Sequence, residues 1–363
     1  MDKLKVGVLG ATGLVGQRFV SLLYKHPWFE LSFLTASEKK SGVKYGEAVN
    51  WLITSELPDD VSEVKLIKND LEDIRAYKPD IVFSALPPEV AVSIEPLLLI
   101  NGIHVVSNAS NMRLEHDIPL LNPEVNADHI GLVQLQRTRG WRGYLLKVPN
   151  CSTAILTLSL KPIMDILKIR NVFVTTLQAV SGAGLTGVPS MSIIDNVIPY
   201  IQNEEEKIEN ETLKILGSYT NGVMVKPKIN VSASCTRVPV IEGHTEIVFV
   251  EFEGDVDLDV GDVRKSLREF KSNKVKGLGL PTAPEEPVVV VEALDRPQPR
   301  LDRLVNNGMA VVVGRVRVVK PLNLLKYVVV GNNLVRGAAG TGVLIAELLT
   351  HYLRRVGDFN VRS

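Results

Sequence analysis

The feature that most constrains the fold is a glycine-rich turn close to the first residue of the chain. Three glycines recur in Gly10-Ala-Thr-Gly13-Leu-Val-Gly16, between a short apolar run at Lys5–Leu9 and an amphipathic stretch at Leu14–Tyr24. This spacing is a variant of the dinucleotide fingerprint, in which glycines let the backbone approach a pyrophosphate at a helix N-terminus. A strand, turn and helix of this kind predict a doubly wound sheet.

The residues of this turn are the first predicted cofactor contacts. Backbone N–H groups at a helix start, strengthened by the helix dipole, bind an anion, and a threonine hydroxyl adds a donor. A tight turn without a ligand is the alternative. The predicted contacts are Gly10, Thr12, Gly13, Leu14 and Val15, together with Ser84 near the end of a later strand.

The end of the second predicted strand bears on the choice between NAD and NADP. A NAD site usually ends this strand with an acid that binds the ribose 2′-hydroxyl. This chain has Thr35-Ala-Ser-Glu-Lys-Lys40 there, so Ser37 replaces the acid and Lys39 follows closely. A hydroxyl with cations suits a 2′-phosphate, whereas Glu38 opposes one. Ser37 and Lys39 therefore predict NADP; use of both cofactors and a merely solvated lysine pair are the alternatives.

The rest of the chain predicts an α/β protein of two domains. Alternating strands and helices in the first third indicate a parallel, Rossmann-type sheet with right-handed crossovers. Longer strands after Pro149 indicate a second, α+β domain with a mixed sheet, and the last helix is expected to pack back onto the first domain. The predicted strands are Lys5–Leu9, Leu31–Ala36, Val64–Ile67, Asp80–Ala85, His104–Ser107, Val172–Val180, Lys228–Arg237, Thr245–Glu253, Pro287–Ala293, Met309–Val319 and Leu324–Val330; the predicted helices are Leu14–Tyr24, Glu89–Ile100, Thr153–Leu167, Asn203–Leu216 and Gly340–Leu353.

Composition excludes several classes of protein. The 363 residues suit two domains, and 41 Lys and Arg residues balance 41 Asp and Glu residues, so no net charge attracts nucleic acid or an anionic membrane. No apolar run approaches the roughly 18 residues of a membrane span. Two distant cysteines are too few for a disulfide scaffold or a zinc knuckle. We therefore expect a cytoplasmic protein that binds no metal, no nucleic acid and no membrane.

Cys151 is the candidate nucleophile. It stands in Val148-Pro-Asn-Cys151-Ser-Thr-Ala, after a strand-like run and at or just before a helix, where the helix dipole stabilises a thiolate. Ser152 or Thr153 can cap that helix. Considered alone, Cys151 could equally be a core residue, which is the interpretation we give to Cys235 because Cys235 lies in a strand pattern.

A nucleophilic thiol needs a base, and His244 is the candidate among six histidines. It ends the segment Arg237-Val-Pro-Val-Ile-Glu-Gly-His244, which we expect to form a turn between two strands of the second domain. A side chain on such a turn can project into a cleft. Without Cys151, a surface turn histidine would be the default interpretation.

Together these segments resemble a known family. The glycine turn, Pro149-Asn-Cys-Ser-Thr153 and the Arg-x-Pro-x-x-x-Gly-His pattern at 237–244 follow one another as in aspartate-semialdehyde dehydrogenases, in particular their archaeal and fungal branch. The resemblance covers essentially the whole chain. It implies a reversible, NADP-dependent, phosphorylating oxidation of L-aspartate 4-semialdehyde to 4-aspartyl phosphate through a Cys151 acyl-thioester, in lysine, threonine and methionine biosynthesis.

The resemblance also assigns roles. It implies that Cys151 is the nucleophile, His244 the general acid/base, and Gln178 the glutamine beside the reacting centre. Arg237 would hold the substrate α-carboxylate by a bidentate fork, and Ser181, Gly182 and Asn333 would contact the cofactor. Residues 1–150 plus 333–363 would bind NADP, and residues 151–332 would form the catalytic and dimerisation domain of a homodimer or a dimer of dimers.

The remaining implied contacts are with the substrate amino and phosphate groups. A glutamate would bind the amino group; Glu204 is the residue we assign, although Glu205 and Glu206 remain open alternatives. Lys207 and Arg113 would bind phosphate, since a dianion needs cations. Ordinary surface charges are the alternative for these residues.

Three other functions fit parts of the pattern. A malonyl-CoA reductase on the same scaffold would keep the thiol, the histidine and NADPH but use a thioester; the polar Asn150 before the cysteine, which we assign to substrate binding, favours an acyl phosphate instead. N-acetyl-glutamyl-phosphate reductase is a more distant enzymatic rival. A redox sensor without turnover would need the nucleotide turn but not the set formed by Gln178, Arg237 and His244.

Overall fold

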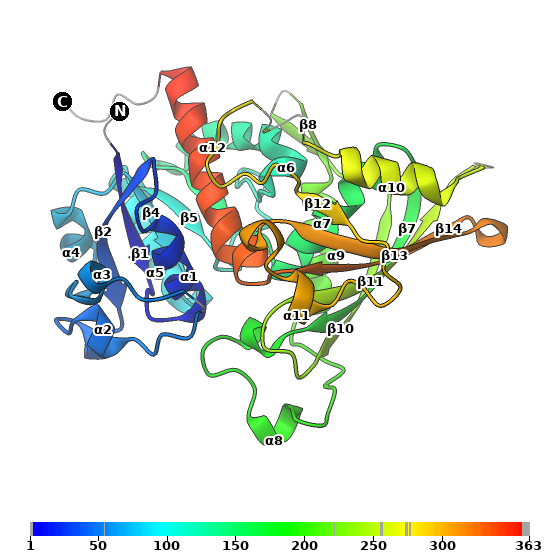
Figure 1. Ribbon diagram of the computed structural model, residues 1–363. Helices are drawn as coiled ribbons and strands as arrows, with labels where there is room; N and C mark the ends of the chain where they lie inside the picture. Colours follow the sequence, from blue (N-terminus) through cyan, green and yellow to red (C-terminus); the bar gives the residue numbers. More distant parts are fainter. Residues whose placement is uncertain are drawn as a thin grey trace. The chain divides into compact units, whose positions relative to one another are not determined.

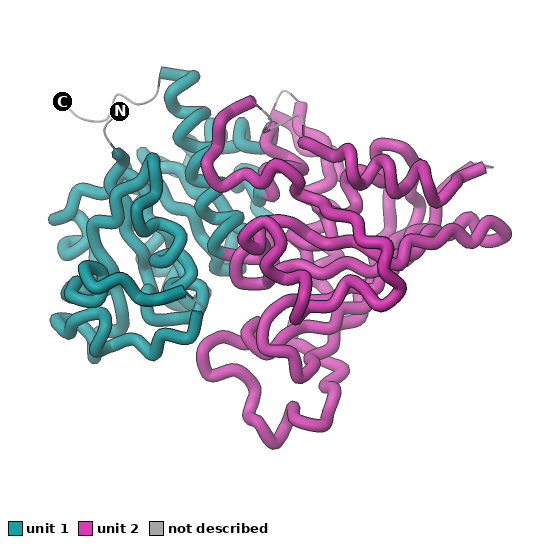
Figure 2. The backbone as a smooth tube through the Cα atoms, viewed as in Figure 1, with its two compact units in different colours: residues 1–121, 129–148, 339–363 teal, residues 122–128, 149–338 magenta. Residues whose placement is uncertain are grey.

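The computed structural model describes residues 3–53, 55–220, 222–254, 257–272, 275 and 277–357. The chain divides into two compact units, residues 1–121, 129–148 and 339–363, and residues 122–128 and 149–338 (Figure 2). The unit limits differ by a few residues from the predicted limits of 150 and 333, and the predicted end at 358–363 lies outside the described residues. Residues 122–128 join the second unit because the Arg336 guanidinium donates to both oxygens of Glu124, at 2.9 and 2.6 Å.

The sheet of the first unit has six parallel strands in the order β3-β2-β1-β4-β5-β6 (Figure 1). This is the doubly wound order, so the predicted fold class is confirmed. The predicted strand at Val64–Ile67 is displaced, because residues 64–66 pair with residues 43–45 instead of with β2. The strands are β1 (Leu4–Leu9), β2 (Phe29–Ala36), β3 (Ile67–Lys68), β4 (Ile81–Ser84), β5 (His104–Ser107) and β6 (Leu145–Lys147).

Helices flank this parallel sheet. The last helix of the chain, α12 (Gly340–Val356), packs on α1 (Leu14–Leu23), where a Cβ at Gly342 would stand 2.7 Å from the Phe19 ring. No helix within the described ranges is long and apolar enough to cross a membrane. The other helices that lie in this unit or begin beside it are η1 (Glu38–Lys40), α2 (Tyr45–Ala48), α3 (Asp59–Ser62), α4 (Leu71–Ala76), α5 (Pro88–Ile100) and η2 (Ala127–Arg139).

The sheet of the second unit is mixed, in the order β10-β7-β11-β14-β13-β12. The pairs β10–β7 and β12–β13 are parallel and the others are antiparallel, as the prediction of a mixed sheet requires. The strands are β7 (Ile169–Gln178), β10 (Asn230–Arg237), β11 (His244–Phe252), β12 (Val288–Val290), β13 (Val311–Val319) and β14 (Leu324–Gly331), and a separate hairpin joins β8 (Ser218–Thr220) to β9 (Val223–Val225).

One face of the mixed sheet is buried, and this face positions the site. Alternate residues of β11, beginning with His244, are buried, while the intervening ones are half-buried. Ile155 of α7 (Cys151–Met164) packs on Gly331, which pairs with His244 across the sheet, so α7 crosses the sheet beside that histidine. The other helices are α6 (Pro123–Asn126), η3 (Val180–Ala183), α8 (Ser190–Ile193), α9 (Glu204–Ile215), α10 (Val260–Glu269), α11 (Pro299–Asp302), η4 (Val305–Gly308), η5 (Lys320–Leu322) and the π-helix η6 (Val335–Ala339).

Candidate active site

A thiol and an imidazole meet in the second unit. Cys151 is the first residue of α7, and its Sγ lies 3.2 Å from Nε2 of His244. The position at a helix N-terminus favours a thiolate. His244 is not on the turn that the sequence predicted: the turn ends at Gly243, whose φ is +100°, and His244 is the first, fully buried residue of β11. The positive φ explains the glycine before the histidine.

Asn150 caps the helix that carries the thiol. Its Oδ1 accepts hydrogen bonds from the backbone N–H groups of Ser152 and Thr153, at 3.0 and 3.2 Å. The helix therefore starts two residues before the predicted Thr153, and the cap is Asn150 rather than either hydroxyl residue. Its Nδ2 donates to Glu204 Oε1 at 2.8 Å, so both ends of the amide have partners in this unit. Binding of substrate by Asn150 stays a prediction.

Gln178 and Glu204 lie side by side next to this cap. Gln178 ends β7, and its Nε2 donates to Glu204 Oε1 at 3.1 Å. Of the three neighbouring acids, only Glu204 is buried here; Glu205 accepts the backbone N–H of Cys235 at 2.9 Å, and Glu206 is exposed. The geometry thus favours Glu204 among the three.

Lys207 and Arg237 supply positive charge to the same unit. Lys207 Nζ is 3.8 Å from Glu204 Oε2 and its side chain is 33% exposed, so the ammonium can still meet a ligand. Arg237 ends β10, is buried, and donates from Nη1 to the Ala179 carbonyl at 2.7 Å. Burial lowers the pKa of Arg237, and the nearby Cys151 and Glu204 favour its charged form.

The environment of His244 keeps its ring neutral. Burial and the positive charge of Arg237 lower the pKa of His244 to about 3. Its Nδ1 accepts the backbone N–H of Ala179 at 3.0 Å. Burial raises the pKa of the other cysteine, Cys235, to about 12; Cys235 is buried in β10, as the strand pattern predicted.

Two further predicted residues connect the loops around the histidine. Asn333 Oδ1 accepts the backbone N–H of Gly243 at 2.8 Å, and its Nδ2 donates to Ser181 Oγ at 2.9 Å. A Cβ at Gly182 would stand 2.6 Å from Arg237 Nη1 and 3.3 Å from His244 Nε2. Ser181, Gly182 and Asn333 therefore lie beside Arg237 and His244; whether they also contact a cofactor stays a prediction.

Sequence reasoning missed Gly337, Glu211 and Glu246. A Cβ at Gly337 would stand 2.6 Å from Cys151 Cβ, and Glu211 accepts the backbone N–H of Asn150 at 2.6 Å. Glu246 is fully buried two residues after His244. Of these three residues, only Glu246 could have been found from the sequence. It lies two residues after His244, and every second residue of a strand shares a face.

The glycine turn of the first unit has the form that a pyrophosphate needs. Gly10 has a φ of +74°, and a Cβ at Gly16 would stand 2.2 Å from the Gly10 carbonyl oxygen, so both positions require glycine. At Gly13 the nearest atom to an added Cβ is 3.6 Å away, which leaves space in front of the uncapped start of α1. Ser84 Oγ is buried and has no hydrogen-bond partner among the described residues. The anionic pyrophosphate of a dinucleotide therefore fits this turn.

The other predicted residues of the first unit differ in exposure. Ser37 and Lys39 are exposed directly after β2. Arg113 is buried and donates from Nη2 to the Asn108 carbonyl at 2.7 Å. Nearby in this unit, the buried Lys147 Nζ donates to Glu95 and to Ser107, at 3.0 and 2.8 Å.

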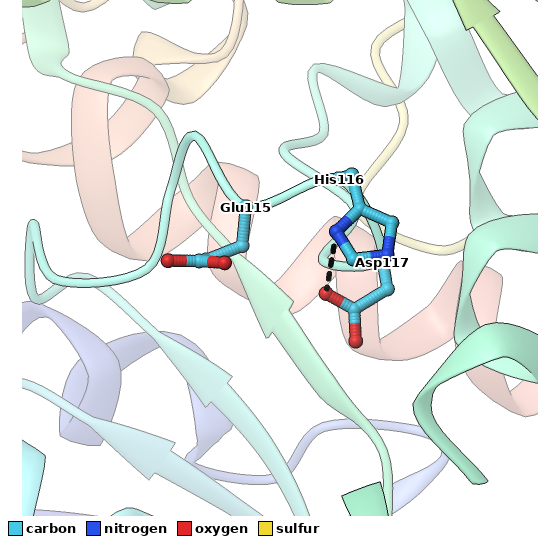
Figure 3. Close-up of side chains that lie close together, drawn as sticks. All are labelled: Glu115, His116 and Asp117. Carbon is cyan, nitrogen blue, oxygen red and sulfur yellow. Dashed lines mark ion pairs between the residues drawn. The ribbon is translucent and has the colours of Figure 1, made fainter. Parts of the chain in front are cut away.

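A surface loop carries three potential metal ligands, and an arginine side chain already pairs with two of them. Figure 3 shows Glu115, His116 and Asp117, in which His116 Nδ1 is 3.9 Å from Asp117 Oδ1. Arg139 donates to both oxygens of Asp117 and lies 3.4 Å from Glu115 Oε2. The guanidinium takes the place that a cation would occupy, so we assign no metal to this loop.

Two family models match the chain. Residues 5–133 match the NAD binding domain of semialdehyde dehydrogenases, and residues 160–336 match their dimerisation domain. A protein of Methanothermobacter thermautotrophicus named aspartate-semialdehyde dehydrogenase is 51% identical over 352 residues, covering 96% of this chain and 100% of its own. The protein of that name from Saccharomyces cerevisiae is 43% identical, covering 94% and 96%.

Solved structures agree with these relatives. The aspartate semialdehyde dehydrogenase of Candida albicans, crystallised with NADP, superposes with a TM-score of 0.86 at 42% identity, covering 96% of this chain and 99% of that one. Aspartate semialdehyde dehydrogenase II of Vibrio cholerae, complexed with ASA, has a TM-score of 0.75 at 28% identity, with coverage of 96% and 99%.

Proposed function

This chain belongs to the aspartate-semialdehyde dehydrogenase family, and from that premise we propose that it carries out the reversible, NADP-dependent oxidation of L-aspartate 4-semialdehyde to 4-aspartyl phosphate through a Cys151 thioester. The observation that carries the proposal is the separation of 3.2 Å between Cys151 Sγ and His244 Nε2 at the start of α7. We propose that the enzyme acts in the cytoplasm and that it contributes to lysine, threonine and methionine biosynthesis.

The first half of the proposed reaction acylates the thiol. The Cys151 thiolate attacks the aldehyde carbon, a C–S bond forms, and the carbonyl oxygen becomes an oxyanion. His244 Nε2 and the Cys151 backbone N–H at the helix start are the groups proposed to stabilise that oxyanion. A nicotinamide cofactor, when bound, accepts the hydride that leaves as the thioester forms.

The second half releases the product. A phosphate oxygen attacks the thioester carbon, a C–O bond forms, and the C–S bond breaks to return the Cys151 thiolate. Lys207 and Arg113 remain the proposed phosphate ligands. Arg237 is proposed to bind the α-carboxylate, and Glu204, which lies between Asn150 and Gln178, the α-amino group.

We propose NADP as the cofactor of the first unit. The glycine turn leaves space for an anion at the start of α1, and the Candida albicans relative was crystallised with NADP. The exposed Ser37 and Lys39 follow β2, where a 2′-phosphate is bound in this fold. The Ser84 hydroxyl at the end of β4, which has no hydrogen-bond partner within the described ranges, is a further proposed contact.

The test compares substrates and thiol variants. Cys151→Ala should lower phosphate-dependent NADP reduction with aspartate semialdehyde by more than about 10⁴-fold, because no other group forms the thioester, while NADP affinity changes little. Cys235→Ala is the matched control, since its thiol is buried in β10.

A second assay addresses the malonyl-CoA alternative. We expect NADPH oxidation with malonyl-CoA to remain at background, because the polar Asn150 before Cys151 favours an acyl phosphate over a thioester substrate. Full turnover by Cys151→Ala, or faster turnover of malonyl-CoA than of the semialdehyde, would refute the proposal.

A further inference from the structure

A network of buried polar side chains lies at the end of the parallel sheet of the first unit. We propose that the ion pair between Lys147 and Glu95 in this network positions the loop 108–113, and through it the Arg113 guanidinium, for binding of phosphate. This inference rests on the proposed function, in which Arg113 is a phosphate ligand. It adds two positioning residues that are too deeply buried to touch substrate themselves.

The network joins two neighbouring strands to a helix. Ser107 ends β5 and Lys147 ends β6, and the two residues pair across the sheet, while Glu95 lies on α5. Lys147 Nζ donates to Glu95 Oε2 at 3.0 Å and to Ser107 Oγ at 2.8 Å, and the Ser107 hydroxyl donates to Glu95 Oε1 at 2.6 Å. Each of the three side chains therefore bonds to the other two.

The ammonium group uses its hydrogen bonds inside the protein. An ammonium has three N–H donors, and Nζ of Lys147 faces three acceptors, since Asn111 Oδ1 lies 3.5 Å from it in addition to Glu95 and Ser107. The Lys147 side chain is also fully buried. Lys147 can therefore act on a ligand only through the residues that it holds.

The loop 108–113 starts on this network. The Ser107 hydroxyl accepts the backbone N–H of Ala109 at 3.2 Å, and the backbone N–H of Asn108 donates to the Ser84 carbonyl at 2.9 Å. The middle of the loop is tied to the ammonium by Asn111. The path of the loop therefore depends on the polar groups at the ends of the strands.

The loop also contains a backbone conformation that needs support. Met112 has a φ of +63°, which residues other than glycine seldom adopt and which persists only where the surrounding structure fixes it. On one side of Met112, Asn111 contacts Lys147; on the other, Arg113 donates from Nη2 to the Asn108 carbonyl at 2.7 Å and closes the loop. The place of the guanidinium thus follows from the path of the loop.

Stability alone does not explain why these charges are buried. Replacing a buried ion pair by apolar residues of similar volume is often neutral or stabilising. Burial lowers the pKa of Lys147, Glu95 raises it, and the like charge of Arg113 lowers it. Arg113 is therefore near enough for its charge to act on Lys147, and Glu95 offsets the repulsion between the two cations.

The test removes both charges of the pair at once. Lys147→Met combined with Glu95→Gln keeps the side-chain volumes similar and leaves neither charge buried without its partner. We expect this double variant to raise KM for inorganic phosphate by about 10-fold or more, the effect of losing a hydrogen bond to a charged group. The kcat at saturating phosphate and the Kd of NADP should stay nearly unchanged, because a rise in KM alone reports weaker binding. A merely structural role would lower the amount of active enzyme and leave KM as it was.

Two single variants complete the test. Ser107→Ala removes the hydroxyl that bonds to both charges but keeps the charges, so it should also raise KM for phosphate; where the double variant does not fold, Ser107→Ala decides. Glu347→Gln is the matched control, because it alters another buried pair of the first unit, with His26 at 3.0 Å, outside the loop. We expect it to leave KM for phosphate unchanged, and a rise equal to that of the other variants would contradict a specific role of the network.

Arg113→Gln separates this inference from the proposed function. It should raise KM for phosphate at least as much as the double variant does. If Arg113→Gln raises this KM while the double variant and Ser107→Ala do not, the network does not position the arginine and the inference is wrong. If Arg113→Gln itself leaves KM for phosphate unchanged, Arg113 is not a phosphate ligand, and the proposed function is wrong at that residue.

Discussion

At the scale of single residues, the position of Cys151, the proposed nucleophile, depends on a glycine. Gly337 lies in the π-helix η6, far along the chain from Cys151, yet a Cβ there would stand 2.6 Å from Cys151 Cβ and 2.9 Å from its Cα. Such distances are too short for two carbon atoms, so any side chain at 337 must displace the cysteine. The absence of a Cβ at Gly337 therefore allows the short approach of Sγ to His244.

We predict that Gly337→Ala lowers kcat by about 10²-fold, because displacements near 1 Å at a reacting group have effects of this size. Gly342→Ala is the control, since its Cβ would meet the Phe19 ring at a similar 2.7 Å but far along the chain from the cysteine. Steady-state kinetics and the rate of thiol alkylation measure the effect, with thermal unfolding to show that both variants fold. Equal kcat values for the two variants would show that Gly337 does not position Cys151.

At the scale of elements, strand β11 carries two very different groups on one face. His244 opens the strand, and Glu246 follows two residues later with its side chain on the same buried face. Neither carboxyl oxygen of Glu246 has a hydrogen-bond partner in the described part of the chain. Burial raises the pKa of Glu246 well above its usual range, although the nearby Ser152 hydroxyl favours the ionised form. We interpret Glu246 as a neutral carboxylic acid behind the start of α7.

This interpretation predicts a pH-dependent stability. The folded state holds a proton on Glu246 that the unfolded chain releases above about pH 4.5, so Glu246 stabilises the fold less as pH rises. Glu246→Gln removes that dependence. We expect its melting temperature relative to the wild type to increase by a few degrees between pH 4.5 and pH 8, measured by calorimetry. A difference between the two proteins that does not vary with pH would contradict a neutral acid.

The elements also show what sequence patterns can and cannot predict. The glycine turn and most of the strands were predictable because each depends on neighbouring residues. The helix that carries Cys151 was predicted to within two residues of its observed start for the same reason. The three-residue β6 was indicated only as a strand-like run before Cys151, without bounds, because so short a strand shows no periodicity. Asn150 as the cap, Gly337 against the thiol and the Ala179 N–H on His244 were not predictable, because each joins segments that only the tertiary fold brings together.

At the scale of the whole molecule, the mixed sheet of the second unit carries two phenylalanines on the face opposite to His244. Phe173 of β7 and Phe249 of β11 pair directly across the sheet, on the face opposite to His244, and Phe173 is 48% exposed. The unit matches the dimerisation domain of the family. We propose that this face forms the dimer.

We predict that Phe173→Glu shifts the protein toward monomer, because a charge at the centre of an apolar interface must be desolvated. Sedimentation velocity over a range of protein concentrations measures the change. Leu52→Glu is the control, because Leu52 is similarly exposed, at 56%, but belongs to the first unit. An unchanged dimer in Phe173→Glu would place the interface elsewhere.

The buried ion pair between Arg336 and Glu124 has a consequence for expressing the second unit as a separate fragment. Glu124 lies in a seven-residue excursion, 122–128, that the chain makes into the second unit before returning to the first. A fragment encoding residues 149–338 would contain the fully buried Arg336 without its carboxylate partner. Leaving such a charge uncompensated costs about 3–5 kcal/mol. The second unit is thus compact in space but is not encoded by one contiguous stretch of the gene. We expect a contiguous segment 149–338 exchanged between relatives to be destabilised, because it lacks Glu124.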